Sequence, residues 1–359
     1  MKVVIVSGIW PPDVGGPASH APELAGFLHE RGHDVHVVTT ADAPPAARIY
    51  PVDWTPRRYP PGVRHFVGAG LVRRAASGAD VVYSTGMLGR SSLGSKIAGV
   101  PLVQRLAGDP AYERALRRGL TRSPLDRFQQ ESGARISVLR RTRDRALRRA
   151  ARIVVPSKAF AEIVSGWGFE AEVVPHAVSA PSLPHAPRNG RTLVFAGRLV
   201  PQKALSVAFE AVRRNEDVTL LVAGDGPERA RIEKAAPANV RFLGAQPREQ
   251  VFELMHAADA TLLSSDWESF GLVVAESLAV GTPVLAASAG GIGELLEDGR
   301  NGLLVPAGDV DGLAAAIGRY FSDVALQARL REAAADSVRR LDPSGIYPRY
   351  EAILEEAAR

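Results

Sequence analysis

Residues 264–283, SSDWESFGLVVAESLAVGTP, decide the predicted fold because a strand, a loop and a helix meet there. The apolar run 260–263 is typical of a buried strand, and Phe270-Gly271 turns the chain into an apolar helix over 272–280. In open α/β sheets, ligands bind where the strands end. The helix dipole and the free first-turn N–H groups favour a phosphate or a sugar hydroxyl there, the groups being those of Gly271, Leu272 and Val273.

Two glutamates flank this turn, Glu268 before the helix and Glu276 inside it. Helical side chains lean toward the N-terminus, so Glu276 should reach back toward a ligand gathered at the turn. A carboxylate on an otherwise apolar helix needs a partner, and two ribose hydroxyls would supply one. The alternative is that Glu276 pairs with an arginine of the core and that Glu268 is a solvated loop acid.

The amino-acid sequence of this segment matches a specific family motif. ESFGLVVAE at 268–276, followed by AVGTPV at 279–284, resembles the E-x7-E segment of retaining nucleotide-sugar glycosyltransferases of family GT4. The resemblance implies the GT-B fold, in which two Rossmann-like doubly wound α/β domains face a central cleft. It also implies that Glu268 faces the donor sugar near its reacting carbon, that Glu276 binds the ribose, and that Phe270 belongs to the donor site.

A second segment, GRLVPQK at 197–203, follows a predicted strand at the same sheet edge. Arg198 offers a planar fork and Lys203 a point charge, which together can clamp a diphosphate. The alternative is two exposed cations. GRL-x-x-x-K resembles the diphosphate-binding segment of the same family, about 70 residues before Glu268 and in the family's order. Weaker correspondences place Gly15 and Gly16 against the donor phosphates and the strand end Phe242-Leu243 against the base.

Apolar runs alternating with amphipathic stretches predict two parallel-sheet domains. Strands are expected at 3–6, 35–39, 80–84, 101–105, 152–155 and 171–175, then at 192–196, 218–223, 240–243, 260–263 and 283–287, with helices from there to the end. The Pro-rich stretch 178–190 predicts a hinge, and the Pro-rich stretch 43–62 an irregular loop. By the resemblance, residues 1–180 bind the acceptor and 190–344 the donor, and the last helix, 345–359, packs back on the first domain.

Composition narrows the class of protein. The chain has 359 residues, 46% of them hydrophobic, which is enough for two cores. It has no Cys, so it has no disulfide framework, thiolate metal site or Cys nucleophile. No apolar run approaches the roughly 18 residues of a membrane span, and we expect a cytoplasmic protein. The net charge of +5 is compatible with nucleic-acid binding. However, the basic residues are mostly arginine and the chain is rich in Ala and Gly, as expected from a GC-rich coding sequence. We therefore expect no nucleic-acid partner.

The most basic span, 114–152, carries seven arginines on one predicted helix, Arg135 to Arg149, together with Ile136, Val138, Leu139 and Leu147. Such a helix can lie on an anionic membrane, here at its inner face, or guide an anionic acceptor. The alternative is a solvated face.

The chain departs from the family at two positions. Family members often carry a His after the fourth strand, where this chain has LAGDPAYE at 106–113, and Asp109 is the candidate substitute on the acceptor side. His176 stands where an Asn is commoner, and it is either structural or ligand-facing.

Competing motifs are weak. Gly224-Asp-Gly226 follows a strand, but Arg229 occupies the third glycine position of a dinucleotide fingerprint. Asp309-Val-Asp311 spells the D-x-D of metal-dependent glycosyltransferases, yet Asp309 is better explained as a helix N-cap. We therefore expect no metal and no cofactor, with a UDP- or GDP-type sugar as donor substrate. The rivals to a transferase are a GT-B nucleotide-sugar epimerase and a nucleotide-sugar-binding protein without turnover.

Overall fold

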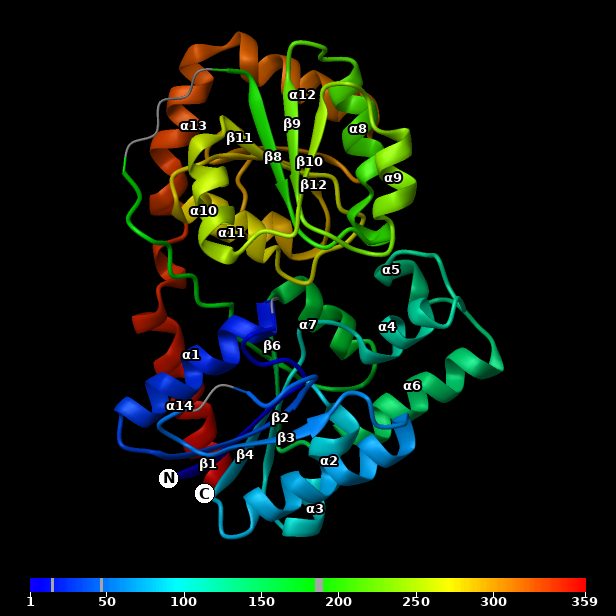
Figure 1. The fold of residues 1–359 in the computed structure, drawn as a ribbon, viewed down its shortest axis with the longest axis vertical. Helices are drawn as coiled ribbons and strands as arrows, with labels where there is room; N and C mark the ends of the chain where they lie inside the picture. The colour runs from blue at the N-terminus through cyan, green and yellow to red at the C-terminus, as the bar shows by residue number, and fades with distance from the viewer. Residues whose placement is uncertain (14–15, 46–47, 185–189) are drawn as a thin grey trace. The chain divides into compact units, whose positions relative to one another are not determined.

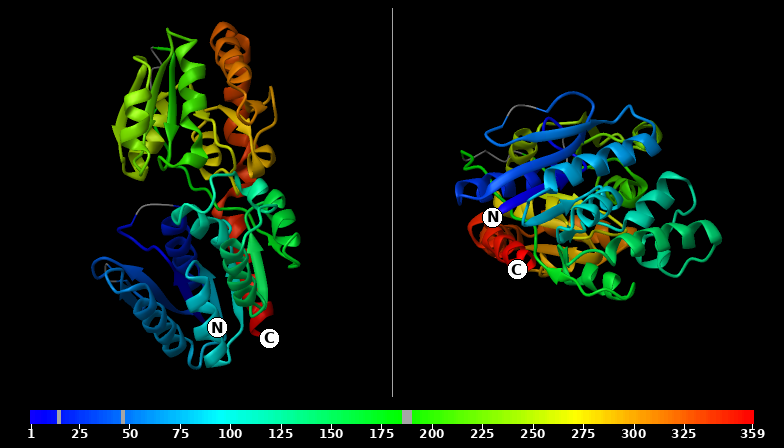
Figure 2. Two further views of the ribbon diagram at one scale, coloured as in Figure 1. Left: turned by 90° about the vertical axis from the view of Figure 1, so that its right-hand side faces the viewer. Right: turned by 90° about the horizontal axis from the view of Figure 1, so that it is seen from below.

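The computed structural model describes residues 1–13, 16–45, 48–184 and 190–359. The chain divides into unit 1, which is Met1–Ala177 with Ser344–Arg359, and unit 2, which is Val178–Pro343. Each unit contains one parallel sheet with helices on both faces (Figures 1 and 2). The predicted limits of 1–180, 190–344 and 345–359 lie close to these.

The sheet of unit 1 grows from a strand of four successive fully buried residues, Val3 to Val6. A run that is apolar on both faces is typical of a parallel strand covered by helices on each side. All pairings are parallel in the order β3-β2-β1-β4-β5-β6-β7. The strands are β1 (Lys2–Ser7), β2 (Asp34–Ala41), β3 (Val52–Pro56), β4 (Val81–Thr85), β5 (Leu102–Arg105), β6 (Arg152–Val155) and β7 (Glu172–Val173).

Helices cover this sheet in two layers. The core beneath α1 (Gly16–Glu30) and α14 (Pro343–Ala358) includes Ile5, Leu24 and Tyr350, whereas Val72 of α2 (Pro61–Ala76) packs on Val4 and Val6 from the other face. α14 follows unit 2 in sequence but is buried in unit 1, as predicted from the family. The remaining helices are α3 (Leu88–Ala98), α4 (Pro110–Arg117), α5 (Leu125–Phe128), α6 (Ala134–Leu147) and α7 (Lys158–Ser165).

Unit 2 repeats the plan with the strand order β10-β9-β8-β11-β12-β13. Its strands are β8 (Thr192–Ala196), β9 (Thr219–Ala223), β10 (Val240–Gly244), β11 (Ala260–Leu263), β12 (Val284–Ser288) and β13 (Gly302–Pro306). Its helices are η1 (Pro201–Lys203), α8 (Leu205–Arg213), α9 (Arg229–Ala235), α10 (Arg248–Ala257), α11 (Leu272–Ala279), η2 (Gly290–Glu294), α12 (Val310–Ser322), α13 (Val324–Ser337) and η3 (Arg339–Leu341).

Two predictions of local structure were wrong. The stretch 43–62, predicted to be an irregular loop, contains β3, which pairs with β2. β3 is an edge strand, so the prolines at its ends, Pro51 and Pro56, remove no hydrogen bond from the sheet interior. The stretch after residue 287 was predicted to be helical, but it contributes β13 beside β12. The apolar run Leu303–Val305 forms that strand.

Candidate active site

The candidate site of unit 2 lies where its strand order reverses. β8 is flanked by β9 on one side and by β11 on the other, so the connections that leave β8 and β11 diverge to opposite faces of the sheet. Such a switch point leaves a crevice at the carboxyl ends of the two strands, which is the usual ligand site of doubly wound sheets. The segments 197–204 and 264–271 both begin there.

An ion pair joins these two segments. Lys203 Nζ lies 2.5 Å from Glu268 Oε1, although the residues are 65 positions apart in sequence. The Ser265 hydroxyl donates to the same carboxylate oxygen at 2.7 Å. Only 16% of the Lys203 side chain and 14% of the Glu268 side chain are exposed. The alternative of a solvated loop acid is therefore wrong for Glu268.

Hydrogen bonds to backbone carbonyls fix the two segments against each other. The Gln202 amide donates to the carbonyl of Trp267 at 2.7 Å, and the Ser264 hydroxyl donates to the Lys203 carbonyl at 3.0 Å. Gly291 N–H donates to the Glu268 carbonyl at 2.8 Å, and a Cβ on Gly290 would lie 2.2 Å from the same oxygen. Only glycine allows this close approach, so the loop after β12 clamps the backbone of Glu268.

Arg198 differs from Lys203 in its surroundings. Its side chain is exposed, and within the described part of the chain its guanidinium has no hydrogen-bond or ion-pair partner. The backbone at Arg198 is fixed nevertheless, because Gly197 N–H donates to the Ala223 carbonyl and Leu199 N–H to the Asp225 carbonyl. The site thus offers one cation already paired with a carboxylate and one that a ligand can engage.

The helix that begins beside this pair is α11. Gly271 stands at its N-cap with φ +87°, a left-handed conformation that favours glycine. The first-turn N–H groups of a helix have no acceptor within the helix, so those of Leu272 and Val273 face outward with the positive end of the dipole. Phe270, just before the cap, is buried in the core of unit 2 and anchors the turn.

Glu276 lies one turn into α11, and its side chain is only 10% exposed. Arg248, the first residue of α10, contacts Glu276 Oε1 through Nε at 3.2 Å and through Nη2 at 3.2 Å. The alternative of an arginine partner is therefore realised. Sequence reasoning could not name that partner, which precedes Glu276 by 28 positions.

The remaining donor-site candidates belong to β10 and to the start of α1. Phe242 is partly buried and packs edge-on against Phe209, with ring centroids 6.0 Å apart. Leu243, next in the strand, is 36% exposed. Gly16 begins α1, and Gly15 lies outside the described residues.

Family comparisons agree with this geometry. Residues 14–180 match the family described as Glycosyltransferase Family 4, and residues 184–337 match the family described as Glycosyl transferases group 1. The chain belongs to the GT4-type glycosyltransferases of the GT-B fold. The family assignment made from residues 197–203 and 268–276 is confirmed.

Curated relatives of this GT4-type chain match it over part of their length. Phosphatidyl-myo-inositol mannosyltransferase of Mycobacterium leprae is 34% identical over 221 residues, which are 58% of this chain and 59% of the relative. Glycogen synthase of Mycobacterium tuberculosis is 35% identical over 179 residues, which are 46% of this chain and 43% of the relative. The chain thus aligns with about half the length of these relatives.

Solved structures match the whole chain. HepE of Anabaena, in complex with UDP and glucose, has a TM-score of 0.80 at 22% identity and covers 99% of this chain and 100% of its own. Sucrose-phosphate synthase from Thermosynechococcus elongatus has a TM-score of 0.80 at 18% identity, with 99% of each chain covered. At these identities the likeness establishes the fold, and the predicted pair of Rossmann-like domains is confirmed.

In unit 1 of this GT4-type chain, Asp109 has a structural task. It caps α4 by accepting from Ala111 N–H at 2.8 Å, and Arg143 Nη1 donates to its other oxygen at 2.9 Å. The two side chains are 0% and 3% exposed. Arg143 also lies over the ring of Trp167, 3.6 Å from the centroid. These contacts support a structural role for Asp109 rather than that of an acceptor-side base.

His176 is also buried among protein partners. Its Nε2 lies 3.0 Å from a guanidinium nitrogen of Arg105, whose Nε donates to the Tyr350 hydroxyl at 2.7 Å. On the same face of the sheet, His20 Nε2 is hydrogen-bonded to the Tyr83 hydroxyl at 2.6 Å. Burial, followed by the charge of Arg105, holds the pKa of both histidines well below the ordinary value. These contacts support a structural role for His176, and sequence reasoning missed Arg105.

The D-x-D motif is divided between two local tasks. Asp309 caps α12 by accepting from Gly312 N–H at 2.8 Å, so the predicted N-cap is confirmed. Asp311, 85% exposed, pairs with Arg214. Neither carboxylate contacts the ion pair of Lys203 and Glu268.

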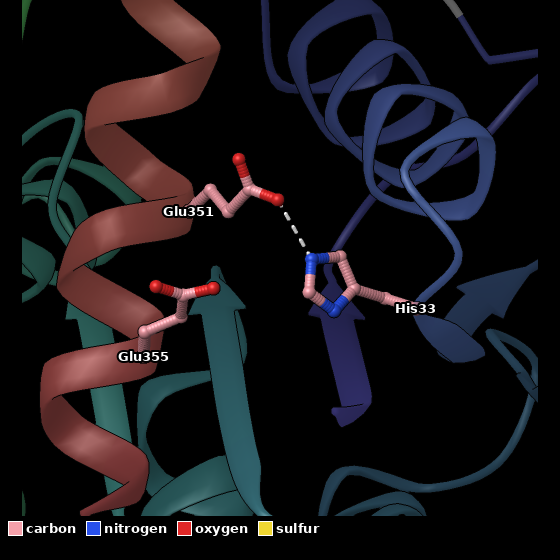
Figure 3. Close-up of side chains that lie close together, drawn as sticks. All are labelled: His33, Glu351 and Glu355. Carbon is pink, nitrogen blue, oxygen red and sulfur yellow. Dashed lines mark hydrogen bonds and ion pairs between the residues drawn. The ribbon is translucent and has the colours of Figure 1, made fainter.

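A separate cluster in unit 1 has metal-ligand residue types. His33, Glu351 and Glu355 place one ligand atom each within 4.8 Å of one another (Figure 3). His33 Nε2 is hydrogen-bonded to Glu351 at 2.8 Å, its Nδ1 lies 3.2 Å from the N-terminal ammonium, and Arg31 donates to Glu351 at 3.2 Å. Burial alone would raise the pKa of Glu351, but the hydrogen bonds from His33 and Arg31 lower it. The ring nitrogens and the central carboxylate are already engaged, so the cluster holds α14 in place as it stands.

Proposed function

We propose that this protein transfers a sugar from a nucleoside diphosphate sugar of UDP or GDP type to an acceptor hydroxyl, with retention of configuration and without a divalent metal. The observation that carries the proposal lies at the switch point of unit 2, where the ion pair of Lys203 and Glu268 stands between the segment that carries Arg198 and the N-terminus of α11. The names of the relatives support it, because they include a mannosyltransferase and structures with UDP bound.

The chemistry follows from where charge develops. As the bond between sugar and diphosphate breaks, negative charge grows on the leaving phosphate, and preorganised cations stabilise that charge most. Arg198 and Lys203 would hold the diphosphate, and the first turn of α11 would add its N–H groups. Glu268 then has two tasks: it orients the Lys203 ammonium, and it faces the sugar released from the phosphate. Glu276 would bind the ribose, whose contacts are the same before and after transfer.

Metal independence is supported by the assigned tasks of the aspartates. Asp309 is used as a helix cap and Asp311 as the partner of Arg214, so the D-x-D does not form a pair of metal ligands at the ion-pair site. The two cations supply the charge that a divalent ion supplies in other glycosyltransferases. Retention of configuration rests on the family resemblance of 268–276.

The test begins with UDP-glucose, GDP-mannose and related donors, screened by thermal shift and then incubated with candidate acceptors in the presence and absence of a chelator. We expect a donor that stabilises the protein by roughly 2.7 kcal/mol at 100 times its Kd. We further expect the rate of transfer to be the same with and without the chelator. We also expect the product from an axial donor to keep an axial anomeric bond, as measured by the proton coupling constant of its anomeric carbon or proton. Activity abolished by the chelator and restored by Mg²⁺ or Mn²⁺ refutes metal independence, and an inverted product refutes retention.

We also propose a peripheral contact between unit 1 and an anionic membrane. Arg135, Arg141 and Arg145 on α6 and Arg148 at its C-cap are exposed, whereas Arg143 is buried with Asp109. The apolar residues predicted to support this contact are mostly unavailable, because Ile136, Leu139 and Leu147 are buried and only Val138 is exposed, by 58%. The described helices include none long and apolar enough to cross a bilayer.

The apolar part of the contact falls on α2 instead. Val63, Phe66 and Val67 are 50%, 70% and 39% exposed and recur at the i, i+3 and i+4 spacing of one helix face. α3 packs against both α2 and α6, so these apolar residues and the exposed arginines lie on helices that share α3 as a neighbour (Figure 1). Apolar residues beside arginines fit the interface of an anionic bilayer.

Co-sedimentation with anionic and neutral vesicles across a salt series tests this contact. Each exposed arginine near the surface contributes about 1 kcal/mol, and salt screens that attraction. We expect binding to anionic vesicles at low salt, release at high salt, and loss of binding when Phe66 becomes Ser or when Arg141 and Arg145 become Gln. Equal sedimentation with neutral vesicles, or none with either kind, rejects the contact.

A further inference from the structure

Glu276 is a buried carboxylate next to the proposed ligand site of unit 2, and its partner is an arginine. Its neighbours on α11 are apolar, and α11 packs against α10 (Figure 1). A carboxylate in such a place is stable only with a charged or hydrogen-bonding partner. Arg248 supplies it through two nitrogens aimed at one oxygen, each at 3.2 Å.

The position of Arg248 is unfavourable for α10 itself. As the first residue of that helix it places a cation at the positive end of the dipole, where an anion is preferred. Its N-cap residue, Pro247, forms no side-chain cap. The local energetics of α10 disfavour Arg248, and its contact with Glu276 offsets that cost.

Contacts with Glu276 and Phe252 restrict the guanidinium of Arg248. It is held by the Glu276 carboxylate at one end and lies over the ring of Phe252, 5.3 Å from the centroid, with 32% of the side chain exposed. A planar group held in this way loses little freedom when a further ligand binds beside it. It also balances the charge of Glu276, which otherwise repels an anionic diphosphate at the N-terminus of the same helix.

We infer that Arg248 is a positioning residue for the donor: it orients the Glu276 carboxylate toward the ribose and screens the diphosphate from it. This inference rests on the proposed function, in which Glu276 accepts from the ribose hydroxyls. Arg248 stays in place when the nucleotide binds. The opposite role is a substitute partner that occupies Glu276 only until the nucleotide displaces it. The two roles predict opposite effects on affinity when the guanidinium is removed.

The experiment is a double-mutant cycle on the full chain, with UDP and GDP as titrants in isothermal calorimetry. Arg248→Met should weaken binding of the preferred nucleotide about tenfold or more, since Glu276 is then neither oriented toward the ribose nor balanced in charge. Arg248→Lys should recover part of the affinity. In a Glu276→Gln background, Arg248→Met should add little, because the arginine acts through that carboxylate. In turnover assays KM should rise while kcat changes little, as expected for a contact kept throughout the reaction.

Arg213→Met is the matched control, because Arg213 forms an exposed ion pair with Glu210 on α8. It should leave nucleotide affinity unchanged. If Arg248→Met lowers the midpoint of thermal unfolding too far for titration, Arg248→Lys and Arg248→Gln carry the test. Unchanged or tighter binding by these variants overturns the inference, as does an equal loss in the Glu276→Gln background. Wild-type protein that binds neither nucleotide overturns the proposed function and this inference with it.

Discussion

Gly224→Ala is the substitution that tests most directly how the cation-bearing segment is held. Gly224 follows β9 with φ +149°, and a Cβ built there would lie 1.9 Å from the carbonyl oxygen of Gly197. Contacts of a real Cβ essentially never fall below 3.0 Å, so one of the two backbones must move by at least 1.1 Å, which is 3.0 minus 1.9. Gly197 begins the segment that carries Arg198 and Lys203.

A displacement of this size is large for a reaction centre. Misplacing groups that hold the reacting atoms by about 1 Å lowers the rate on the order of 10²-fold. Forcing a Cβ into this conformation also costs about 1–3 kcal/mol of folding free energy. We therefore expect Gly224→Ala to fold with a lower midpoint of urea unfolding and to lose about two orders of magnitude in kcat/KM.

The assay compares Gly224→Ala with Gly293→Ala, in which the new Cβ meets nothing within 4 Å. Both proteins are assayed well below their unfolding midpoints, so that folded enzyme is compared with folded enzyme. Gly293→Ala should match the wild type. If Gly224→Ala turns over at nearly the wild-type rate with unchanged stability, segment 197–203 does not hold the diphosphate in the way proposed.

Three further outcomes are expected. Lys203→Ala should lower kcat by on the order of 10² or more because it removes a cation from the leaving phosphate, and steady-state kinetics near the wild-type values would contradict this. Glu276→Ala should weaken binding of the free nucleoside diphosphate, because Glu276 is proposed to bind the ribose. Glu268→Ala should lower turnover and leave that affinity nearly intact. If calorimetry shows the same loss of nucleotide affinity in both variants, the two glutamates do not have these separate roles. His20 and His176 are neutral in the fold because their pKa values are depressed, so the unfolded chain binds more protons below its ordinary histidine pKa of about 6.5. Stability should fall as pH drops below about 6.5, by up to about 2.7 kcal/mol per pH unit for two protons, and urea titrations at pH 7.5 and 5.5 showing no such change would exclude it.

The sequence predicted that segments 197–203 and 264–271 lie at the same sheet edge, because parallel strands deliver their following loops to one edge, but it did not predict the ion pair between Lys203 and Glu268. It also predicted the cap formed by Asp309, which depends on a spacing of three residues. Helix caps and strand ends depend on residues a few positions apart, so they can be predicted without a structure.

The errors involved contacts between distant positions. Asp109 precedes Pro110, a helix-start pattern, but its burial depends on Arg143, 34 positions later. Arg248 precedes Glu276 by 28 positions, and no periodicity links them. β3 was obscured by its flanking prolines, which only an edge position tolerates. The helical period of the arginine-rich stretch was visible, but which side of α6 faces the core depends on α3 and α4.

The division of unit 1 into two stretches has a consequence for the order of events on the ribosome. The core of unit 1 includes Ile346, Tyr350 and Leu354 from α14. The ribosome synthesises the 166 residues of unit 2, from 178 to 343, before it reaches them. At about 5–20 residues per second, the N-terminal stretch waits roughly 8–33 s for its last helix. During that interval unit 2 can complete its own core, while the part of the β1–β7 sheet that later receives α14 stays uncovered beside α1. The first unit to begin synthesis is therefore the last to finish folding, and chaperone binding to nascent chains should peak while residues 178–343 are being made.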